Sequence, residues 1–208
     1  MLFRSVLDGN GHTVSFTMTA DCDTGSWING YGLFGQMLFS GATIKNIAFD
    51  NITLTGTNIG GLFAGNTGDA ARITFENVYV KAANLSEGAY TNLFTGTASG
   101  SATTFVMKNV VVEVMADHGK NNYYQVGVIH GSGVDATSFV CENTYLITTV
   151  QLNNKNTSYS GENGSADTKF TGMFIYENYD AMKNANHNYS GFGEHWDITS
   201  GYPVWAND

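Results

Sequence analysis

The sequence contains few residues that form disulfides, interrupt regular secondary structure or carry a charge. It has two cysteines, one proline and only 13% charged residues. Two cysteines, Cys22 and Cys141, exclude a disulfide framework and a cysteine-based zinc site. No apolar run approaches the roughly 20 residues that cross a bilayer, so we expect no membrane insertion. The segment 1–6 is too short for a signal peptide, and we interpret the start as a fragment boundary.

Basic residues are also scarce. Nine Lys and Arg stand against 18 Asp and Glu, which gives a net charge of −9. This charge repels phosphate backbones, so we expect no nucleic acid partner. The chain contains instead 42% hydrophobic residues and 25 glycines, a composition typical of strands joined by tight turns. A length of 208 residues suits one domain.

Two short signatures alternate along the chain. The first is a glycine followed by two apolar residues, with Asn92 replacing glycine once: Gly32-Leu33-Phe34, Gly61-Leu62-Phe63, Asn92-Leu93-Phe94, Gly127-Val128-Ile129 and Gly172-Met173-Phe174. The second is a charged residue followed by asparagine: Lys45-Asn46, Glu76-Asn77, Lys108-Asn109 and Glu142-Asn143. These asparagines are 31, 32 and 34 residues apart, a period that fits one coil of a β-solenoid.

Runs with a two-residue alternation surround each asparagine. When the coils are aligned on asparagine, the columns that begin with Ile44, Ile47 and Phe49 are expected to point inward. Stacked coils place such residues about 4.8 Å apart, so that each column becomes an apolar ladder. We therefore predict an all-β fold, a parallel β-solenoid of about five coils in residues 1–174, with a long loop at 151–169.

The asparagines and the charges before them are predicted to form two further columns. Each asparagine is expected to turn a corner in the left-handed conformation and to hydrogen-bond to the next coil; direct ligand contact is the alternative. The charges alternate in sign, so stacking places each beside an opposite one, which stabilises by about 0.2 to 1 kcal/mol per pair. The predicted columns are Asn46, Asn77, Asn109 and Asn143, and Lys45, Glu76, Lys108 and Glu142.

Residues 175–208 lose the repeat. They are rich in large apolar side chains, namely Met182, Phe192, Trp196, Tyr202 and Trp205, and Pro203 interrupts any strand there. We expect this part to form an irregular C-terminal cap over the last coil, because an uncovered strand edge pairs with other molecules.

Three parts of the sequence resemble a known group of proteins. The opening Leu7-Asp8-Gly9-Asn10-Gly11-His12-Thr13-Val14, the Gly-Leu-Phe coils and the end from Trp196 to Trp205 resemble right-handed β-helix segments of bacterial surface proteins. Those segments belong to the broad pectin-lyase-like group and are similar to GLUG-type repeat proteins. The resemblance covers about Leu7 to Trp205 and implies a right-handed β-solenoid with an extracellular or cell-surface location. Because the same coils occur in adhesins, phage tail spikes and polysaccharide-cleaving enzymes, it implies no particular activity.

Catalytic patterns of such enzymes are incomplete in this sequence. Asn66-Thr67-Gly68-Asp69 and His130-Gly131 are partial echoes of polygalacturonase-like hydrolases, but the paired aspartates are missing, and glycoside hydrolysis needs two cooperating carboxylates. Calcium-dependent lyases need a basic residue and clustered acids. Only Arg4 and Arg72 are present, and the acids are dispersed. We expect no catalytic residue, no metal site and no cofactor.

Tyrosines are the candidate ligand-binding residues. Tyr79 and Tyr145 are predicted to point outward after the asparagine corner, Tyr123 and Tyr124 lie in a connection, and Tyr159 lies in the long loop. Aromatic faces stack on sugar rings, so these residues predict contact with a polysaccharide or a host or cell-surface glycan. The alternative is that they cover neighbouring apolar side chains.

The sequence thus favours a non-enzymatic extracellular module of a larger surface protein, either adhesin-like or carbohydrate-contacting. A polysaccharide lyase or glycoside hydrolase fragment is the first alternative, and a trimeric phage tail-spike segment is the second. The oligomeric state stays open.

Overall fold

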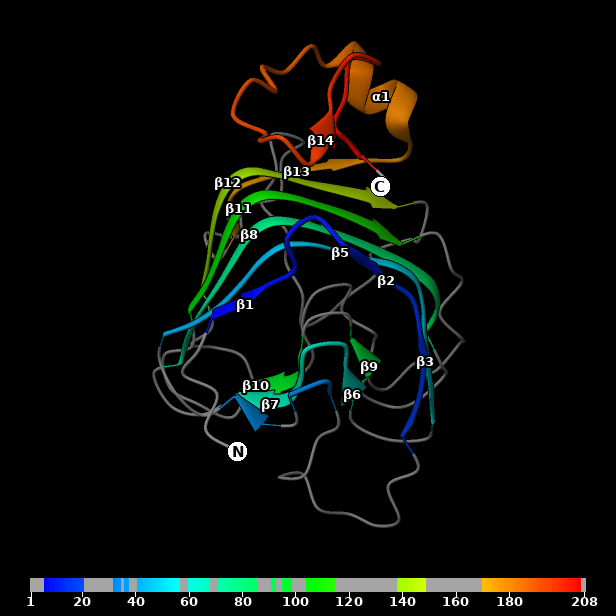
Figure 1. Cartoon of the computed structure of the whole chain (residues 1–208), viewed down its shortest axis with the longest axis vertical. Helices are drawn as coiled ribbons and strands as arrows, with labels where there is room; N and C mark the ends of the chain where they lie inside the picture. The colour runs from blue at the N-terminus through cyan, green and yellow to red at the C-terminus, as the bar shows by residue number, and fades with distance from the viewer. Residues whose placement is uncertain are drawn as a thin grey trace.

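The computed structural model describes residues 6–20, 32–34, 36–37, 41–56, 60–67, 71–85, 91–92, 95–98, 104–114, 138–148 and 170–206. Their main feature is one large, strongly curved sheet of eight strands, in which every strand pairs in parallel with its neighbour (Figure 1). The strands are β1 (Val6–Asp8), β2 (Thr13–Val14), β3 (Thr17–Ala20), β5 (Ala42–Gly56), β8 (Arg72–Leu85), β11 (Thr104–Val114), β12 (Ser138–Thr148) and β13 (Phe170–Tyr176). The prediction of an all-β fold with parallel strands is confirmed.

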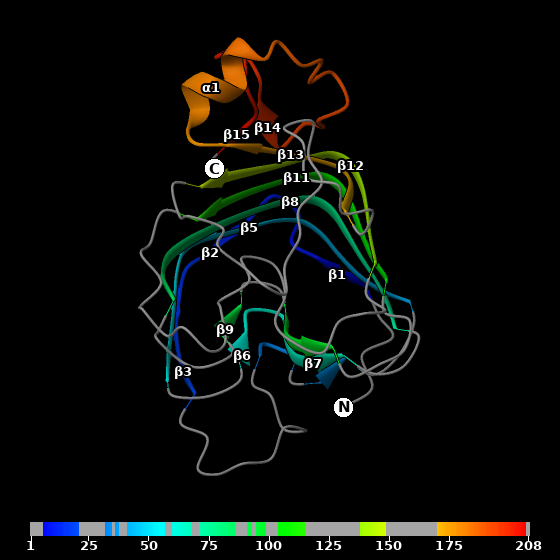
Figure 2. The same ribbon diagram turned by 180° about the vertical axis from the view of Figure 1, so that it is seen from behind.

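Two small parallel sheets face the concave side of the large sheet, as the two opposite views show (Figure 2). One has the order β10-β7-β4 and the other joins β6 to β9. Their strands are β4 (Gln36–Met37), β6 (Gly60–Gly61), β7 (Ala64–Thr67), β9 (Thr91–Asn92) and β10 (Thr95–Ala98). The short strands match the Gly and Thr content of these segments, since small residues allow tight turns between strands.

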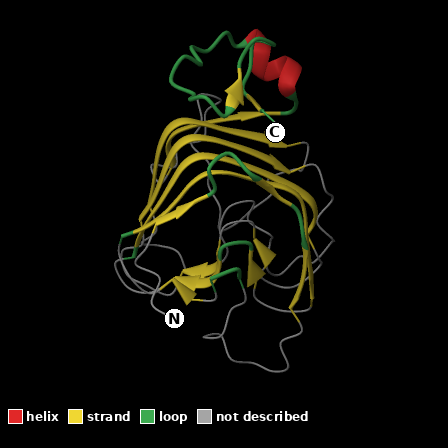
Figure 3. Cartoon of the chain, viewed as in Figure 1, coloured by secondary structure: helices red, strands yellow, loops and turns green. Residues whose placement is uncertain are grey.

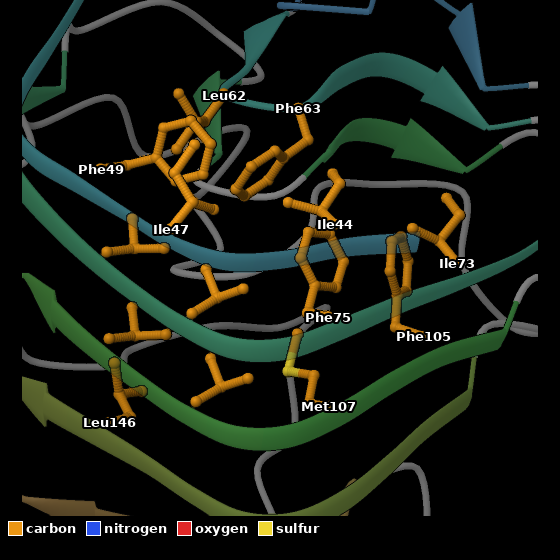
Figure 4. Close-up of a cluster of buried hydrophobic side chains, with 14 of the residues drawn as sticks. Ile44, Ile47, Phe49, Leu62, Phe63, Ile73, Phe75, Phe105, Met107 and Leu146 are labelled. Atoms are coloured by element: carbon orange, nitrogen blue, oxygen red, sulfur yellow. The ribbon is translucent and has the colours of Figure 1, made fainter. Parts of the chain in front are cut away.

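The core fills the concave side of the large sheet (Figure 4). Register places Ile44, Phe75, Met107 and Cys141 side by side on successive strands, and the columns from Ile47 and Phe49 are buried in the same cluster. Phe63, from the second Gly-Leu-Phe signature, packs at 5.0 Å from Phe49 and 4.8 Å from Phe75 between ring centroids. The alternation in the sequence therefore predicted the buried columns correctly.

One signature was misassigned. Gly172-Met173-Phe174 lies in β13 of the large sheet, where Met173 pairs with Thr144 and Phe174 with Tyr145. Gly172 has φ +83° and sits against the Cys141 carbonyl, so that any Cβ would clash with it. This glycine turns the corner that asparagine turns in the preceding strands, because glycine also accepts positive φ.

The C-terminal segment, residues 177–206, packs on the convex side of the large sheet (Figure 3). It contains the helix α1 (Tyr179–Asn184), capped by the Asn178 side chain, and the antiparallel pair β14 (Trp196–Asp197) and β15 (Val204–Trp205). We expected residues 175–208 to cover the edge of the last coil. The segment instead lies across the outer face of several strands, because that face is apolar and needs a cover.

Candidate functional site

The asparagine column divides the outer side of the large sheet into two faces. Asn46, Asn77, Asn109 and Asn143 all adopt the left-handed conformation, with φ between 48° and 53°. Each Nδ2 donates to a side-chain oxygen on the preceding strand: Asn143 to Asn109 (3.0 Å), Asn109 to Asn77 (3.0 Å), Asn77 to Asn46 (3.1 Å) and Asn46 to Asp8 (3.0 Å). All the amides therefore point the same way, and a carboxylate accepts the last hydrogen bond.

Charged residues of alternating sign follow the column on one side. Lys45 pairs in register with Asp8 and Glu76, and Lys108 pairs with Glu76 and Glu142. Lys45 Nζ lies 3.1 Å from Asp8 Oδ2. The pKa of Asp8 is lowered because its carboxylate accepts hydrogen bonds from the Asn10 backbone and the Asn46 amide and lies beside Lys45. We call the outer surface that carries these residues the charged face.

The tyrosine face lies on the other side of the column. Register aligns its first outward positions, which are Ala48, Tyr79, Val111, Tyr145 and Phe174. Tyr145 is 1% exposed, stacked on Phe174 and in edge contact with Tyr189 of the C-terminal segment. Tyr79 is half-buried and lies in edge contact with Trp196. Both tyrosines point away from the core, as expected, but the C-terminal segment packs on them, so that Tyr145 is buried and Tyr79 is half-buried. Their surroundings fit the alternative that they cover neighbouring apolar side chains.

The C-terminal segment runs along the asparagine column. Gly191 O accepts a hydrogen bond from Asn109 Nδ2 (2.8 Å), and a Cβ at Gly191 would lie 2.6 Å from Asn143 Nδ2. Four residues further on, the His195 ring lies directly against Gly11, where a Cβ would be 2.7 Å from Nδ1. The segment thus crosses the sheet from its last strands to its first, which requires glycine where its backbone meets the amides.

Aromatic side chains pack at two places along this segment. His187 hydrogen-bonds to the Tyr176 hydroxyl and packs against Phe174 with ring centroids 4.4 Å apart. At the second place Trp196 and Trp205 meet edge to face at 4.9 Å. Their indole N–H groups are buried without an acceptor in the described ranges, so this pair is held by packing rather than by hydrogen bonds.

A buried carboxylate joins the sheet to α1. Glu113 Oε2 accepts hydrogen bonds from the hydroxyls of Tyr79 (2.8 Å) and Tyr179 (2.9 Å), while Lys81 Nζ lies 3.6 Å from Oε1. We call these four residues the Glu113 cluster. Burial and the nearby Glu113 charge raise the pKa of both tyrosines. Their hydroxyls stay protonated and act as donors, an arrangement that fixes the C-terminal segment on the sheet.

Sequence reasoning missed the Glu113 cluster. The only signal was a single acid inside the apolar run from Val110 to Val114, and such a residue is costly to bury without donors. Its partner Tyr179 lies 66 positions away, so no local pattern joins the two. The other predicted ligand residues, Tyr123, Tyr124 and Tyr159, lie outside the described residues.

The described part of the chain shows neither a metal site nor a membrane-spanning helix. Within it no three side chains of the His, Cys, Asp and Glu types come together as a metal site, and none of its helices has the length and apolar character of a membrane span. Burial raises the pKa of the Cys141 thiol to about 12. Comparison with known proteins finds no matching family model, no matching curated protein and no matching solved structure.

Proposed function

We propose that this chain forms a right-handed parallel β-solenoid and serves as a non-enzymatic extracellular module of a larger surface protein, adhesin-like or carbohydrate-contacting. The asparagine column is the observation that carries this proposal, because its hydrogen bonds join successive strands from Asn143 to Asp8. A fold that repeats one unit about every 4.8 Å presents long regular faces, which suits contact with extended polymers.

The functional groups that the structure brings together also favour a structural role. The Glu113 carboxylate accepts from two tyrosine hydroxyls, and Asp8 is held by Asn46, Asn10 and Lys45. Glu113 and Asp8 thus both bind side chains of neighbouring elements. Contact with a polysaccharide or a cell-surface glycan would then involve Tyr123, Tyr124 and Tyr159, because Tyr145 is covered.

Retention on immobilised acidic and neutral polysaccharides tests the proposal. We expect one polymer to retain the chain, and we expect a Tyr123→Ala, Tyr124→Ala, Tyr159→Ala variant to lose retention. Val204→Ala is the control, since Val204 is exposed on the C-terminal segment. Retention that is unchanged by the tyrosine substitutions contradicts the proposed contact.

The same incubations distinguish the module from an enzyme. New reducing ends or unsaturated products that disappear on substitution of one acid would establish a hydrolase or a lyase in place of the module. A trimer in light scattering would instead favour a tail-spike segment.

A further inference from the structure

The charged face is regular and partly exposed. Its first outward column contains β-branched residues on five strands, which register aligns as Val6, Thr43, Thr74, Val106 and Val140. Val6 is 60% exposed and Val140 51% exposed, whereas the tyrosine face is covered by the C-terminal segment. Exposed valines beside a column of charges give this face both apolar and charged groups for contact with a partner.

The second column of the charged face restricts the kind of partner. Its sign alternates from strand to strand through Asp8, Lys45, Glu76, Lys108 and Glu142. A partner of uniform charge meets attraction and repulsion in turn along this column. Only a surface that alternates with the same spacing of about 4.8 Å matches every charge. The charged face itself has that spacing and that alternation.

We propose that the charged face binds the charged face of a second copy of this chain, across a twofold axis parallel to the strands. The face presents six strand positions, β1, β5, β8, β11, β12 and β13, so the axis falls between β8 and β11. This axis places β5 opposite β12 and β8 opposite β11 of the second copy. A twofold contact of this kind is self-complementary, with each pair occurring twice.

The charges decide the register of this dimer. Because the number of strand positions is even, the axis pairs odd with even positions. The four charges on β5, β8, β11 and β12 each meet an opposite charge, whereas Asp8 of β1 lies opposite β13, which carries no charged residue. Lys45 faces Glu142 of the second copy, and Glu76 faces Lys108. In the first column Thr43 faces Val140, and the half-buried Val106 faces Thr74. A shift by one strand would place like charges opposite each other, which is destabilising.

The size of the face predicts a weak dimer. Six strands at about 4.8 Å and two columns about 7 Å apart give a patch of roughly 29 by 14 Å, or about 800 Å² for both copies together. This area is below that of standard stable complexes, so the dimer should depend on concentration. Each copy also carries a net charge of −9, so association should need physiological salt to screen the long-range repulsion.

Zero-length cross-linking of the native chain tests the geometry directly. A carbodiimide joins a lysine amine to a carboxylate without a spacer. Lys45 and Glu142 of one chain are three strand steps, about 14 Å, apart, which is too far for a direct bond, whereas they face each other in the dimer. We expect a Lys45–Glu142 cross-link in the dimer, and mixed-isotope peptides when labelled and unlabelled chains are combined. A monomer up to millimolar concentration, or a dimer without this cross-link, overturns the proposal.

Substitutions separate the dimer from the fold. Val140→Lys should weaken dimerisation in sedimentation equilibrium by about tenfold or more, because it places an unmatched charge opposite Thr43 within the contact. The matched control is Val204→Lys, since Val204 is also exposed (40%) but lies on the C-terminal segment. Equal dimerisation of the two variants would contradict the proposal.

A charge exchange gives a second, independent readout. Lys108→Glu should weaken the dimer, because it opposes two pairs of like charges across the axis. Adding Glu76→Lys restores those two pairs between copies, while within each chain like charges are adjacent at positions 45 and 76 and at positions 108 and 142. We therefore expect the double variant to regain dimerisation but to keep a lowered melting temperature. A folded double variant that stays monomeric would show that the charges do not face each other.

Discussion

Replacing Asn109 by alanine is the sharpest test of the asparagine column. Asn109 is buried, donates to Asn77 and to Gly191 O, and accepts from Asn143. Three hydrogen bonds at about 1 kcal/mol each, and about 1 kcal/mol for alanine in the left-handed conformation, give a loss of about 4 kcal/mol in the free energy of unfolding. Asn109→Gly should lose only about 3 kcal/mol, because glycine removes the conformational cost.

Asn51 provides the matched control. It also has a positive φ, of 56°, but it is exposed and lies outside the column. Asn51→Ala should therefore lose only the conformational part, about 1 kcal/mol. The assay is urea unfolding followed by tryptophan fluorescence, with the slope of the transition checked for constancy. Equal losses for Asn109→Ala and Asn51→Ala would refute the reasoning, since the hydrogen bonds would then contribute nothing.

Three further predictions concern the C-terminal segment. Gly191→Ala should lower the melting temperature because its Cβ would lie 2.6 Å from an amide nitrogen, whereas Gly193→Ala, with its nearest atom at 3.9 Å, should be tolerated. Glu113→Ala should cost about 2 to 4 kcal/mol in urea unfolding because two hydroxyls lose their acceptor, and Lys81→Ala, at a side chain 44% exposed, less than about 1 kcal/mol. The raised pKa of both tyrosines in the Glu113 cluster means that their contribution to stability is complete below pH 10 and is lost as pH rises further; tyrosine absorbance and near-ultraviolet circular dichroism should change together there.

The repeat made the strands and the core predictable. Alternation around each asparagine is a local signal, and it gave the inward columns that begin with Ile44, Ile47 and Phe49. The asparagines were recognisable because few other residues accept positive φ and can also hydrogen-bond along a stack. Alignment on the asparagines gave the register of the pairing, which places the alternating charges from Lys45 to Glu142 on neighbouring strands.

The outer side of the sheet was not predictable in the same way. A two-residue alternation says which side chains leave the core, but not whether solvent or another segment meets them. The alternation therefore predicted that Tyr79 and Tyr145 point outward, but it did not predict that the C-terminal segment packs on them. The position of that segment depends on contacts between residues far apart in sequence, such as Tyr179 with Glu113, and single-sequence patterns do not contain such pairings.

The two ends of the asparagine column differ from its interior, and this difference bears on fibre formation. β1 carries Asp8, whose carboxylate accepts a hydrogen bond but cannot donate one, and β13 carries Gly172, which has no side chain. If two copies were stacked head to tail, the amide chain of one would be interrupted before it reached the other. Neither β1 nor β13 can therefore extend the row of amide hydrogen bonds into a second copy, which disfavours head-to-tail stacking into fibres.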